Sequence, residues 1–335
     1  MIKKTEMTND KEMNGISRRS FIRKTAFAGA GIMLSSTGLF GASKPAMAAA
    51  DNSVVDEIFR QAIDFHLHNG PDIIPRKVDD IGLCKLYMET GLTGFVLKSH
   101  HTCTAERVYM LRKMFPKLET YGAIALNRVF GGMNVRALEM FSKLEGNHLR
   151  MVWFPTQDAE NDEKTKYSEA VKIFDDGKLT KETREVIKFC ANKKLILNTG
   201  HLHTQEAFHV AEAAREMGVE RVVCTHVTNA NTRMSVENQK KIAKMGGYLE
   251  YNWLQIHYYK EDPKSPKGLS PQVAADWIKE VGADHIIFDT DFGQANNPSS
   301  PEGMRALITE MLNLGISKAD LIKMTSTNPY KLLRL

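Results

Sequence analysis

Short apolar runs alternate with amphipathic stretches along most of the chain. The runs are rich in β-branched and aromatic residues and are bounded by glycine, proline or polar clusters, which is typical of buried strands. Residues 183–194, between two such runs, have the hydrophobic spacing of a helix with one apolar face, and 204–218 has the same character. We predict eight strands, at residues 62–66, 94–98, 121–126, 150–154, 195–199, 221–225, 247–251 and 285–289.

The repeated alternation of strand and helix favours one architecture. Eight such units predict a parallel sheet closed into a single-domain (β/α)8 TIM barrel, an α/β fold. An open, doubly wound sheet is the alternative, but no G-x-G-x-x-G motif follows the first strand, which weakens a nucleotide-binding fold of that kind. The longest connection, residues 157–180, is interpreted as a loop over the barrel mouth with a turn at 175–177.

The first 48 residues have a different pattern. "SRRSFIRK" at 17–24 precedes an apolar, small-residue stretch and then "AMA" at 46–48, the order found in a secretory signal. Adjacent Arg18 and Arg19 indicate the twin-arginine type. A transmembrane anchor is the alternative, yet the apolar stretch is shorter than the roughly 20 residues that cross a bilayer. We therefore predict a signal peptide at 1–48 and the barrel at 49–335.

Removing this signal changes the charge of the chain. The whole sequence has 45 basic and 40 acidic side chains; residues 1–48 contain eight and three of them, which leaves 37 of each in the mature part. This balance gives no reason to expect nucleic acid as a partner. We expect a small-molecule substrate, the twin-arginine export machinery as a transient partner, a periplasmic or otherwise exported location, and no stable membrane span in the mature chain. The sequence leaves the oligomeric state open.

Four cysteines lie in the predicted barrel domain. Cys190 falls in a helical pattern and Cys224 in an apolar strand run, where a free cysteine packs as a small hydrophobic side chain. An exported protein can form disulfides. We nevertheless expect no structural disulfide.

Histidines cluster at the carboxyl ends of the predicted strands, where the active sites of TIM barrels lie. Alternate side chains of an extended strand share a face, which places the two histidines of "FHLH" on one face and Phe65 and Leu67 on the other. Lys98, Asp289 and Asp291 end two of the same strands. Seven of the eleven histidines occupy these ends, namely His66, His68, His100, His101, His201, His203 and His226.

These residue types point to a metal site. Neutral imidazole nitrogens and a carboxylate suit zinc and similar divalent ions, and a catalytic ion keeps one position open for water. An acid close by can take the proton of that water. Asp291 is the candidate, because it lies in phase with Asp289 on the eighth strand, and we expect it opposite His66 and His68 across the barrel.

The ordered set resembles the amidohydrolase superfamily of metal-dependent hydrolases. H-x-H on the first strand, histidine on the fifth and sixth and aspartate on the eighth follow its order, and "TNPYKLLRL" at 327–335 is similar to a common ending of its members. Together with "VLKSHH", "NTGHLH", "THV" and "GGYLEY", these motifs are most similar to a small branch of the superfamily. The resemblance implies a buried ion on His66 and His68, a second ion or the substrate on His201 and His226, and Asp291 as ligand and proton shuttle.

One feature departs from the binuclear members of that superfamily. They carry a carboxylated lysine or a glutamate on the fourth strand, whereas "MVWFPTQD" has no such residue before Asp158. Lys98, on the second strand, could replace it as a carbamate. As an ammonium it would instead bind a substrate carboxylate or pair with Asp289, since the pKa of lysine shifts readily on burial. We include Lys98 among the candidate ligands and expect one or two divalent ions, zinc being the predicted metal.

Further polar residues are assigned to the substrate. His100 and His101 follow the second strand, and at least one of them is expected to face the barrel mouth. Asn127 and Arg128, at the end of the third strand, are expected to hold an anionic group, a surface ion pair being the alternative. His203 is expected to cap or line the start of the following helix rather than bind metal.

The sequence therefore predicts an exported metal-dependent hydrolase that uses metal-activated water on an amide, lactone or other ester bond. His226 helps to polarise the reacting oxygen and Asp291 passes a proton to the leaving group. Glu250 and Asn252 are weaker candidates. A single-metal decarboxylase of an aromatic or related carboxylic acid is the alternative, because the fourth strand lacks a bridging ligand. A non-catalytic periplasmic barrel that only binds a metal or a ligand is the third interpretation, ranked below the two enzymes.

Overall fold

The structure is a computed structural model that describes residues 50–162 and 169–334. The predicted signal peptide, with Arg18 and Arg19, lies outside the described residues, so the domain boundary at residue 48 and the export route stay predictions. No helix within the described ranges is both long and apolar enough to cross a membrane.

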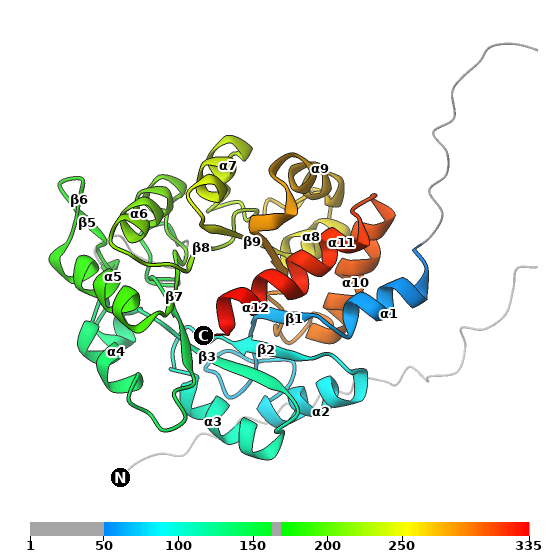
Figure 1. Ribbon diagram of the computed structural model, residues 1–335, viewed down its shortest axis with the longest axis horizontal. Helices are drawn as coiled ribbons and strands as arrows, with labels where there is room; N and C mark the ends of the chain where they lie inside the picture. The colour runs from blue at the N-terminus through cyan, green and yellow to red at the C-terminus, as the bar shows by residue number, and fades with distance from the viewer. Residues whose placement is uncertain (1–49, 163–168, 335) are drawn as a thin grey trace, which may run out of the picture. The chain divides into compact units, whose positions relative to one another are not determined.

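Eight parallel strands form the barrel, in the spatial order β1-β2-β3-β4-β7-β8-β9-β10 (Figure 1). At the seam, His68 N donates to Phe292 O at 2.8 Å and Asp291 N donates to His66 O at 2.9 Å, which joins the end of β10 to β1. The predicted (β/α)8 barrel is therefore confirmed. The strands are β1 (Ile63–Leu67), β2 (Gly94–Leu97), β3 (Glu119–Ala125), β4 (Leu149–Trp153), β7 (Ile196–Asn198), β8 (Val222–Cys224), β9 (Tyr248–Asn252) and β10 (Ile286–Asp289).

Helices follow the strands and surround the barrel (Figure 1). A short helix begins at Lys318, passes into one π-helical turn at Lys323–Thr327, and continues as a last helix that ends at Leu333. The two predicted helices are found as α5 and α6, with ends that differ from the prediction by at most two residues. The helices are α1 (Asn52–Phe59), α2 (Asp80–Thr90), α3 (Ala105–Met114), α4 (Val135–Phe141), α5 (Lys181–Lys193), α6 (Thr204–Glu216), α7 (Val236–Lys244), α8 (Trp253–Glu261), α9 (Pro271–Val281), α10 (Ser300–Asn313), α11 (Lys318–Ile322) and α12 (Asn328–Leu333).

Capping residues set the start of the helices. In α5 the side chain of Thr180 accepts from Thr183 N, and the helix then buries Val186, Ile187 and Cys190 against the barrel. The side chain of His203 caps α6, which confirms its predicted place at the start of that helix.

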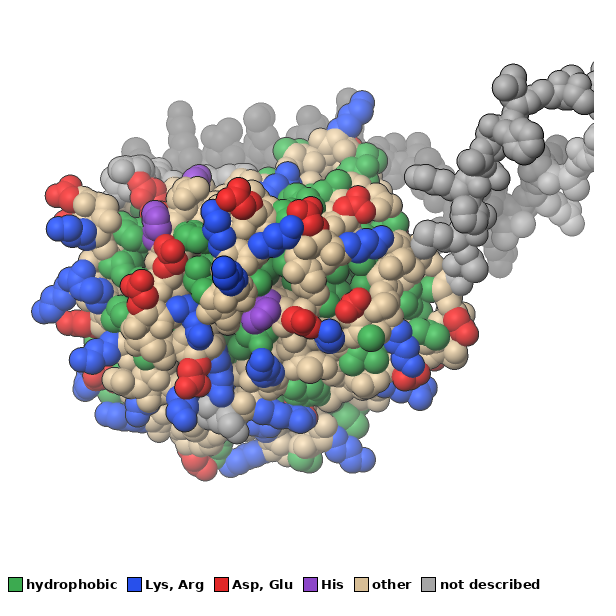
Figure 2. All heavy atoms as spheres, turned by 45° about the horizontal axis from the view of Figure 1, so that its top comes forward, with side chains coloured by type: hydrophobic (Ala, Val, Ile, Leu, Met, Phe, Trp, Pro, Cys, Tyr) green, Lys and Arg blue, Asp and Glu red, His purple; other side chains and the backbone are tan. Residues whose placement is uncertain are grey.

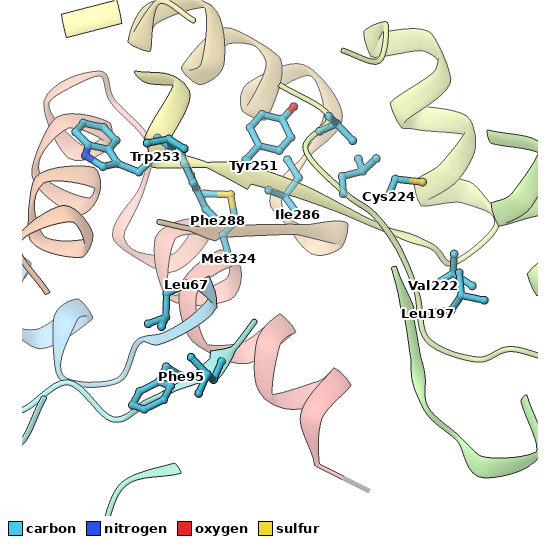
Figure 3. Packing of buried hydrophobic residues seen from close by; sticks show 14 of the residues in the cluster. Leu67, Phe95, Leu197, Val222, Cys224, Tyr251, Trp253, Ile286, Phe288 and Met324 are labelled. Carbon is cyan, nitrogen blue, oxygen red and sulfur yellow. The ribbon is translucent and has the colours of Figure 1, made fainter. Parts of the chain in front are cut away.

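Buried hydrophobic side chains form two layers, one on each side of the barrel wall. The outer layer packs against the helices, and Figure 3 shows Phe95, Ile286 and Phe288 in it together with Met324. The C-terminal helix α12 adds Leu332 and Leu333 to the inner layer, and Arg334 after it pairs with Glu119 at the start of β3. The amino-terminal end of the barrel is thus closed, whereas the carboxyl end carries the polar side chains. The inner layer includes Ile63, Phe65, Val96, Ala123, Met151, Trp153, Ile196, Val223 and Ile287.

A β-bulge changes the predicted facing of side chains in β1. One extra residue lies in β1 between its pairings with β2. Phe65 packs inside the barrel and Leu67 packs outside it, so the prediction that these two share a face is wrong. His66 and His68 do lie together, each with Nε2 3.3 Å from an oxygen of Asp291. Bulges of this kind often re-aim side chains at active sites.

The long connection after β4 contributes to the barrel mouth. A short antiparallel hairpin, β5 (Phe174–Asp175) and β6 (Lys178–Leu179), surrounds a turn at Asp176 and Gly177, where φ is 46° and 71°. The predicted turn at 175–177 is therefore confirmed. The first part of the connection after β4 supplies Gln157, Asn161 and Asp162 to the cavity at the barrel mouth.

All four cysteines are buried and free. Burial raises the pKa of each of their thiols to about 12. These side chains fill the packed interior as small apolar groups. They are Cys84, Cys103, Cys190 and Cys224.

Charged side chains of both signs are interspersed on the face of the molecule that Figure 2 shows. The hydrophobic side chains among them form small separate areas there. This face offers no electrostatic reason to prefer a polyanionic partner, and the absence of a nucleic-acid partner stays a prediction.

Candidate functional site

A cavity of about 300 Å³ opens at the carboxyl ends of the barrel strands. The connections after the strands form its walls, and the ends of β1, β2, β8 and β10 supply its most buried polar groups. Six residues predicted for the site line it: His68, Lys98, His100, His201, His226 and Asp291.

Three side chains converge so that each offers one ligand atom to a common point. These atoms, from His66, His226 and Asp291, all lie within 4.8 Å of one another. Nε2 of His66 is 3.3 Å and Nε2 of His226 is 3.9 Å from an oxygen of Asp291. A second, deeper set consists of His66, Glu250 and Asp289. Within the described residues, His68 and His201 belong to neither set.

Asp291 lies beside the histidine pair of β1, and the expectation that it faces them from across the barrel is wrong. The reason is that β10 is the neighbour of β1 in the closed sheet. Asp291 and His226 both have a left-handed backbone, with φ of 51° and 53°. Such conformations in residues other than glycine are uncommon and cluster at functional sites.

Two side chains of β9 orient the imidazoles. Nδ1 of His66 is 2.9 Å from Oε1 of Glu250, and Nδ1 of His226 is 2.6 Å from Oδ1 of Asn252. The amide of Asn252 donates to Glu250 at 2.9 Å and to Asp289 at 2.6 Å, so its oxygen faces His226. His226 therefore donates from Nδ1 and keeps the lone pair of Nε2 for a metal.

Two more histidines are held in the same way by the loops. Nδ1 of His201 lies 2.9 Å from Oδ2 of Asp162. Nδ1 of His100 lies 2.8 Å from Oγ1 of Thr156, which also accepts from Nδ2 of Asn127. Because a hydroxyl group can donate one hydrogen bond while it accepts another, Thr156 can donate to Nδ1 of His100, and the ring then carries its proton on Nε2.

Burial controls the charge of the ionisable groups. It holds the pKa of each imidazole of His66, His68, His100 and His226 well below its usual range, with the positive charge of nearby Lys98 contributing. Burial also raises the pKa of Asp291 to about 7, the pKa of Glu250 to about 8, and the pKa of Asp289 well above its usual range. In the metal-free site the imidazoles therefore resist protonation, and the carboxyl groups hold their protons to a higher pH than usual.

Lys98 is buried beneath the histidines. Its Nζ lies 4.7 Å from the ring centroid of Trp153, and burial lowers the pKa of Lys98 to about 8. No hydrogen bond or ion pair to Nζ is present in the described part of the chain, so the pairing with Asp289 is not formed. The inward side chain at the end of β4 is Trp153, which cannot bridge two metal ions.

The buried residues at this point fit a divalent metal ion. Several buried atoms have no hydrogen-bond partner within the described ranges, which is costly unless another group satisfies them. They combine imidazole nitrogen with carboxylate oxygen, the donor set that zinc prefers. They are Nε2 of His66, Oε2 of Glu250 and Oδ2 of Asp289, with Nζ of Lys98 beside them.

The four residues predicted to bind substrate lie in different places. His100 lines the cavity, whereas His101 contacts Asp72 at 3.3 Å and Gln157 at 3.0 Å. Asn127 is buried, and its amide holds the backbone of His100 and the side chain of Thr156.

Arg128 is outside the main cavity. Its side chain is 54% exposed, lies 3.3 Å from Glu169, and lines a separate surface depression. This arrangement is the surface ion pair that the sequence left as the alternative.

Three residues of the site received little or no weight from the sequence. Glu250 is fully buried on β9, and its inward phase with Tyr248 and Asn252 is the signal that could have found it. Arg76 and Asp162 lie on connections without periodicity, and their sequence surroundings carry no comparable signal.

Comparison with protein families and solved structures gives the following matches. A model described as "Family of unknown function (DUF6282)" matches residues 61–250. None of the curated proteins matches this chain.

Among solved structures, the chain is similar to an amidohydrolase from Pseudomonas aeruginosa, with 14% identity, a TM-score of 0.58 and coverage of 84% of this chain and 98% of that one. An amidohydrolase from Burkholderia multivorans with bound zinc has 11% identity and a TM-score of 0.55, over 82% and 99%. A probable 2-pyrone-4,6-dicarboxylic acid hydrolase from Acinetobacter baumannii, with bound citric acid, has 12% identity and a TM-score of 0.53, over 82% and 100%. At these identities the likeness shows the fold.

Proposed function

Because this chain belongs to DUF6282, a family of unknown function, we propose its activity from the site itself: a metal-dependent hydrolase that cleaves an amide, lactone or other ester bond of a small molecule. The observation that carries the proposal is the convergence of His66, His226 and Asp291 on one point at the end of a cavity. Amidohydrolase-type proteins of the same fold support it.

The ion would be held by His66, His226 and Asp291, with His68 beside them. We propose zinc, which a neighbour of the same fold contains. A bound divalent ion supplies Lewis acidity and lowers the pKa of a water in its open coordination position.

Asp291 and His100 supply the proton chemistry. Asp291, whose carboxylate would lie beside the open position of the ion, can accept a proton and return it to the leaving group. The carbonyl oxygen of the substrate needs a hydrogen-bond donor as charge develops on it. The hydrogen-bond network favours Nε2–H of His100 for that role and leaves His226 as a metal ligand.

A decarboxylase that uses one ion is the second candidate. Trp153 occupies the inward position at the end of β4, which favours a single ion over a bridged pair. Some single-metal barrels of the amidohydrolase type remove carbon dioxide from aromatic acids, so the two reactions need a direct comparison.

The test begins with the metal content of protein purified without chelator, followed by a panel of lactones, amides and aromatic acids. We expect about one divalent ion per chain, hydrolysis of at least one lactone or amide, and no carbon dioxide. His66→Ala, which removes a ligand, serves as the inactive control. Release of carbon dioxide from an aromatic acid would replace the hydrolase by the lyase, and protein without metal and without turnover would contradict both.

A further inference from the structure

Arg76 is a buried cation in the wall of the cavity. It lies on the connection between β1 and α2, its side chain is only 5% exposed, and it lines the cavity next to His68. Nε and Nη2 of Arg76 both donate to one oxygen, Oδ2 of Asp72, at 2.8 and 2.6 Å. Nη2 also lies 3.4 Å from Nδ1 of His68, while Nη1 makes no hydrogen bond within the described ranges.

The contact with Asp72 fixes the guanidinium but does not use it fully. The other oxygen of Asp72 accepts from Ile73 N at 2.7 Å and lies 3.3 Å from Nδ1 of His101, so the carboxylate is itself held in place. A guanidinium can bind a second carboxylate through the two parallel N–H groups of another edge. Nη1 of Arg76 is left for that purpose, and a carboxylate on the Nη1–Nη2 edge would replace the long 3.4 Å contact of Nη2 with His68.

The charge of the cavity favours an anion. Arg76 and Lys98 are buried cations of its lining, Asp291 is a buried carboxylate there, and Asp72 pairs with Arg76. The divalent ion of the proposed function would add further positive charge. An anionic substrate would offset part of this positive charge.

Apolar side chains of the lining favour a ligand whose remaining part is apolar. Ile74, Leu254 and Tyr258 line the same cavity, whose volume is about 300 Å³. A small molecule with an apolar body and one charged end would fit this combination of groups.

We infer that the substrate carries a carboxylate and that Arg76 binds it through its Nη1–Nη2 edge. This inference rests on the proposed function and names the substrate class: a small amide, lactone or ester with a carboxylate near the bond that is cleaved. The contact of Arg76 with His68 puts the carboxylate on the β1 side of the candidate metal site. The competing explanation is that Arg76 binds Asp72 only to clamp the connection between β1 and α2 in place.

Matched pairs of substrates separate the two explanations. Each pair is an amide, lactone or ester that bears a carboxylate and its counterpart with a primary carboxamide instead. We expect wild-type protein to prefer the carboxylate, and Arg76→Gln to lose about 10–100-fold in kcat/KM on the carboxylate member with little change on the other. Asp72→Asn breaks the same clamp but leaves the guanidinium, so it should keep the preference. Equal losses in both variants would establish the clamp and overturn the inference.

Binding without turnover gives an independent readout. Titration calorimetry with benzoate and benzamide should show benzoate affinity reduced at least tenfold in Arg76→Gln, an intermediate value in Arg76→Lys, and no change in Arg128→Gln on the surface. Melting temperature and metal content confirm that each variant is folded. Benzoate held by the metal alone would bind Arg76→Gln as well as wild type and would contradict the inference.

The outcomes also separate this inference from the proposed function. If the wild type hydrolyses nothing but its benzoate binding depends on Arg76, the anion site stands and the hydrolase fails. If the wild type hydrolyses both members of each pair equally, the hydrolase stands and the role of Arg76 is wrong.

Discussion

Asp291 lies 3.3 Å from Nε2 of both His66 and His68, and asparagine there would keep the size of the side chain but could not carry a proton near neutral pH. We expect Asp291→Asn to fold, to retain metal and to lose about 10²–10⁴-fold in turnover. His66→Ala should lose metal first and activity as a consequence. Metal analysis and kcat on the same preparations check both expectations.

Asp289 provides the comparison for that variant. Its carboxylate accepts from the amide of Asn252 and lies in the deeper set of polar groups. Asp289→Asn should therefore have the milder effect. A dead Asp289→Asn beside an Asp291→Asn within a few-fold of wild type would move the proton path to Asp289.

Lys98 decides how many ions the site holds. If its buried Nζ is carboxylated and bridges two ions, Lys98→Ala should reduce the metal content from two ions to about one or none. If it stays an amine, wild-type protein should hold one ion and the variant should keep it. The intact mass of the native protein and its metal content make the measurement, and a single retained ion would contradict the carbamate.

Single residues of the site were predictable where a polar side chain stands at the end of an apolar strand. His66, His68, His226 and Asp291 stand at the ends of apolar runs, and the barrel fold brings such ends together. Arg76 could not be found in this way, because its position depends on a non-periodic loop and on a contact with Asp72 that only the folded chain forms.

The turn after β10 is the element that sets the distance between Asp291 and β1. Gly293 in this turn has a φ of 132°, and a Cβ atom there would lie 1.8 Å from the carbonyl oxygen of His68. Gly293→Ala should therefore push the turn away from β1, at a cost of at least about 2 kcal/mol, and weaken metal binding. Thermal unfolding and metal titration provide the measurements.

Gly218→Ala is the matched control for the backbone effect. Gly218 has a φ of 88°, and a Cβ there would meet nothing within 4 Å. It should cost about 1–2 kcal/mol from backbone conformation alone and leave metal affinity unchanged. Equal metal affinity in both variants would show that the turn does not position Asp291.

Elements were predicted well where hydrophobic spacing is strong. All eight barrel strands lie at the expected places, with ends that differ by at most two residues, because buried runs bounded by polar clusters leave little freedom. The bulge in β1 was not predictable, since an extra residue in one strand depends on its pairing with β2 and leaves no mark in the apolar pattern.

On the scale of the whole molecule, metal binding should be linked to protons. In the metal-free protein burial raises the pKa of Asp291 to about 7 and the pKa of Glu250 to about 8, so both carry protons over much of the range below pH 7. Zinc binds deprotonated ligands. Zinc addition at pH 7 should therefore release protons, and its affinity should rise between pH 6 and pH 8. Calorimetry in buffers of different ionisation enthalpy measures the release, and a buffer-independent enthalpy would contradict it.

The destination of the whole chain depends on residues outside the described ranges. We propose export through the twin-arginine route because Arg18 and Arg19 precede an apolar stretch and a small-residue cleavage pattern. Arg18→Lys combined with Arg19→Lys should trap the uncleaved protein in the cytoplasm, whereas Arg23→Lys should not. Cell fractionation decides, and a normal periplasmic level of the double variant would reject the route.

The four buried thiols allow the opening of the barrel to be followed chemically. Iodoacetamide reacts with thiolate, and a thiol with a pKa of about 12 in the interior must wait for an opening that exposes it. If the barrel opens as one unit, intact masses should show chains with no added group or four. If its halves open separately, Cys84 and Cys103 should be alkylated at one rate, and Cys190 and Cys224 at another. The alkylation pattern would thus reveal whether the barrel is one cooperative unit or two.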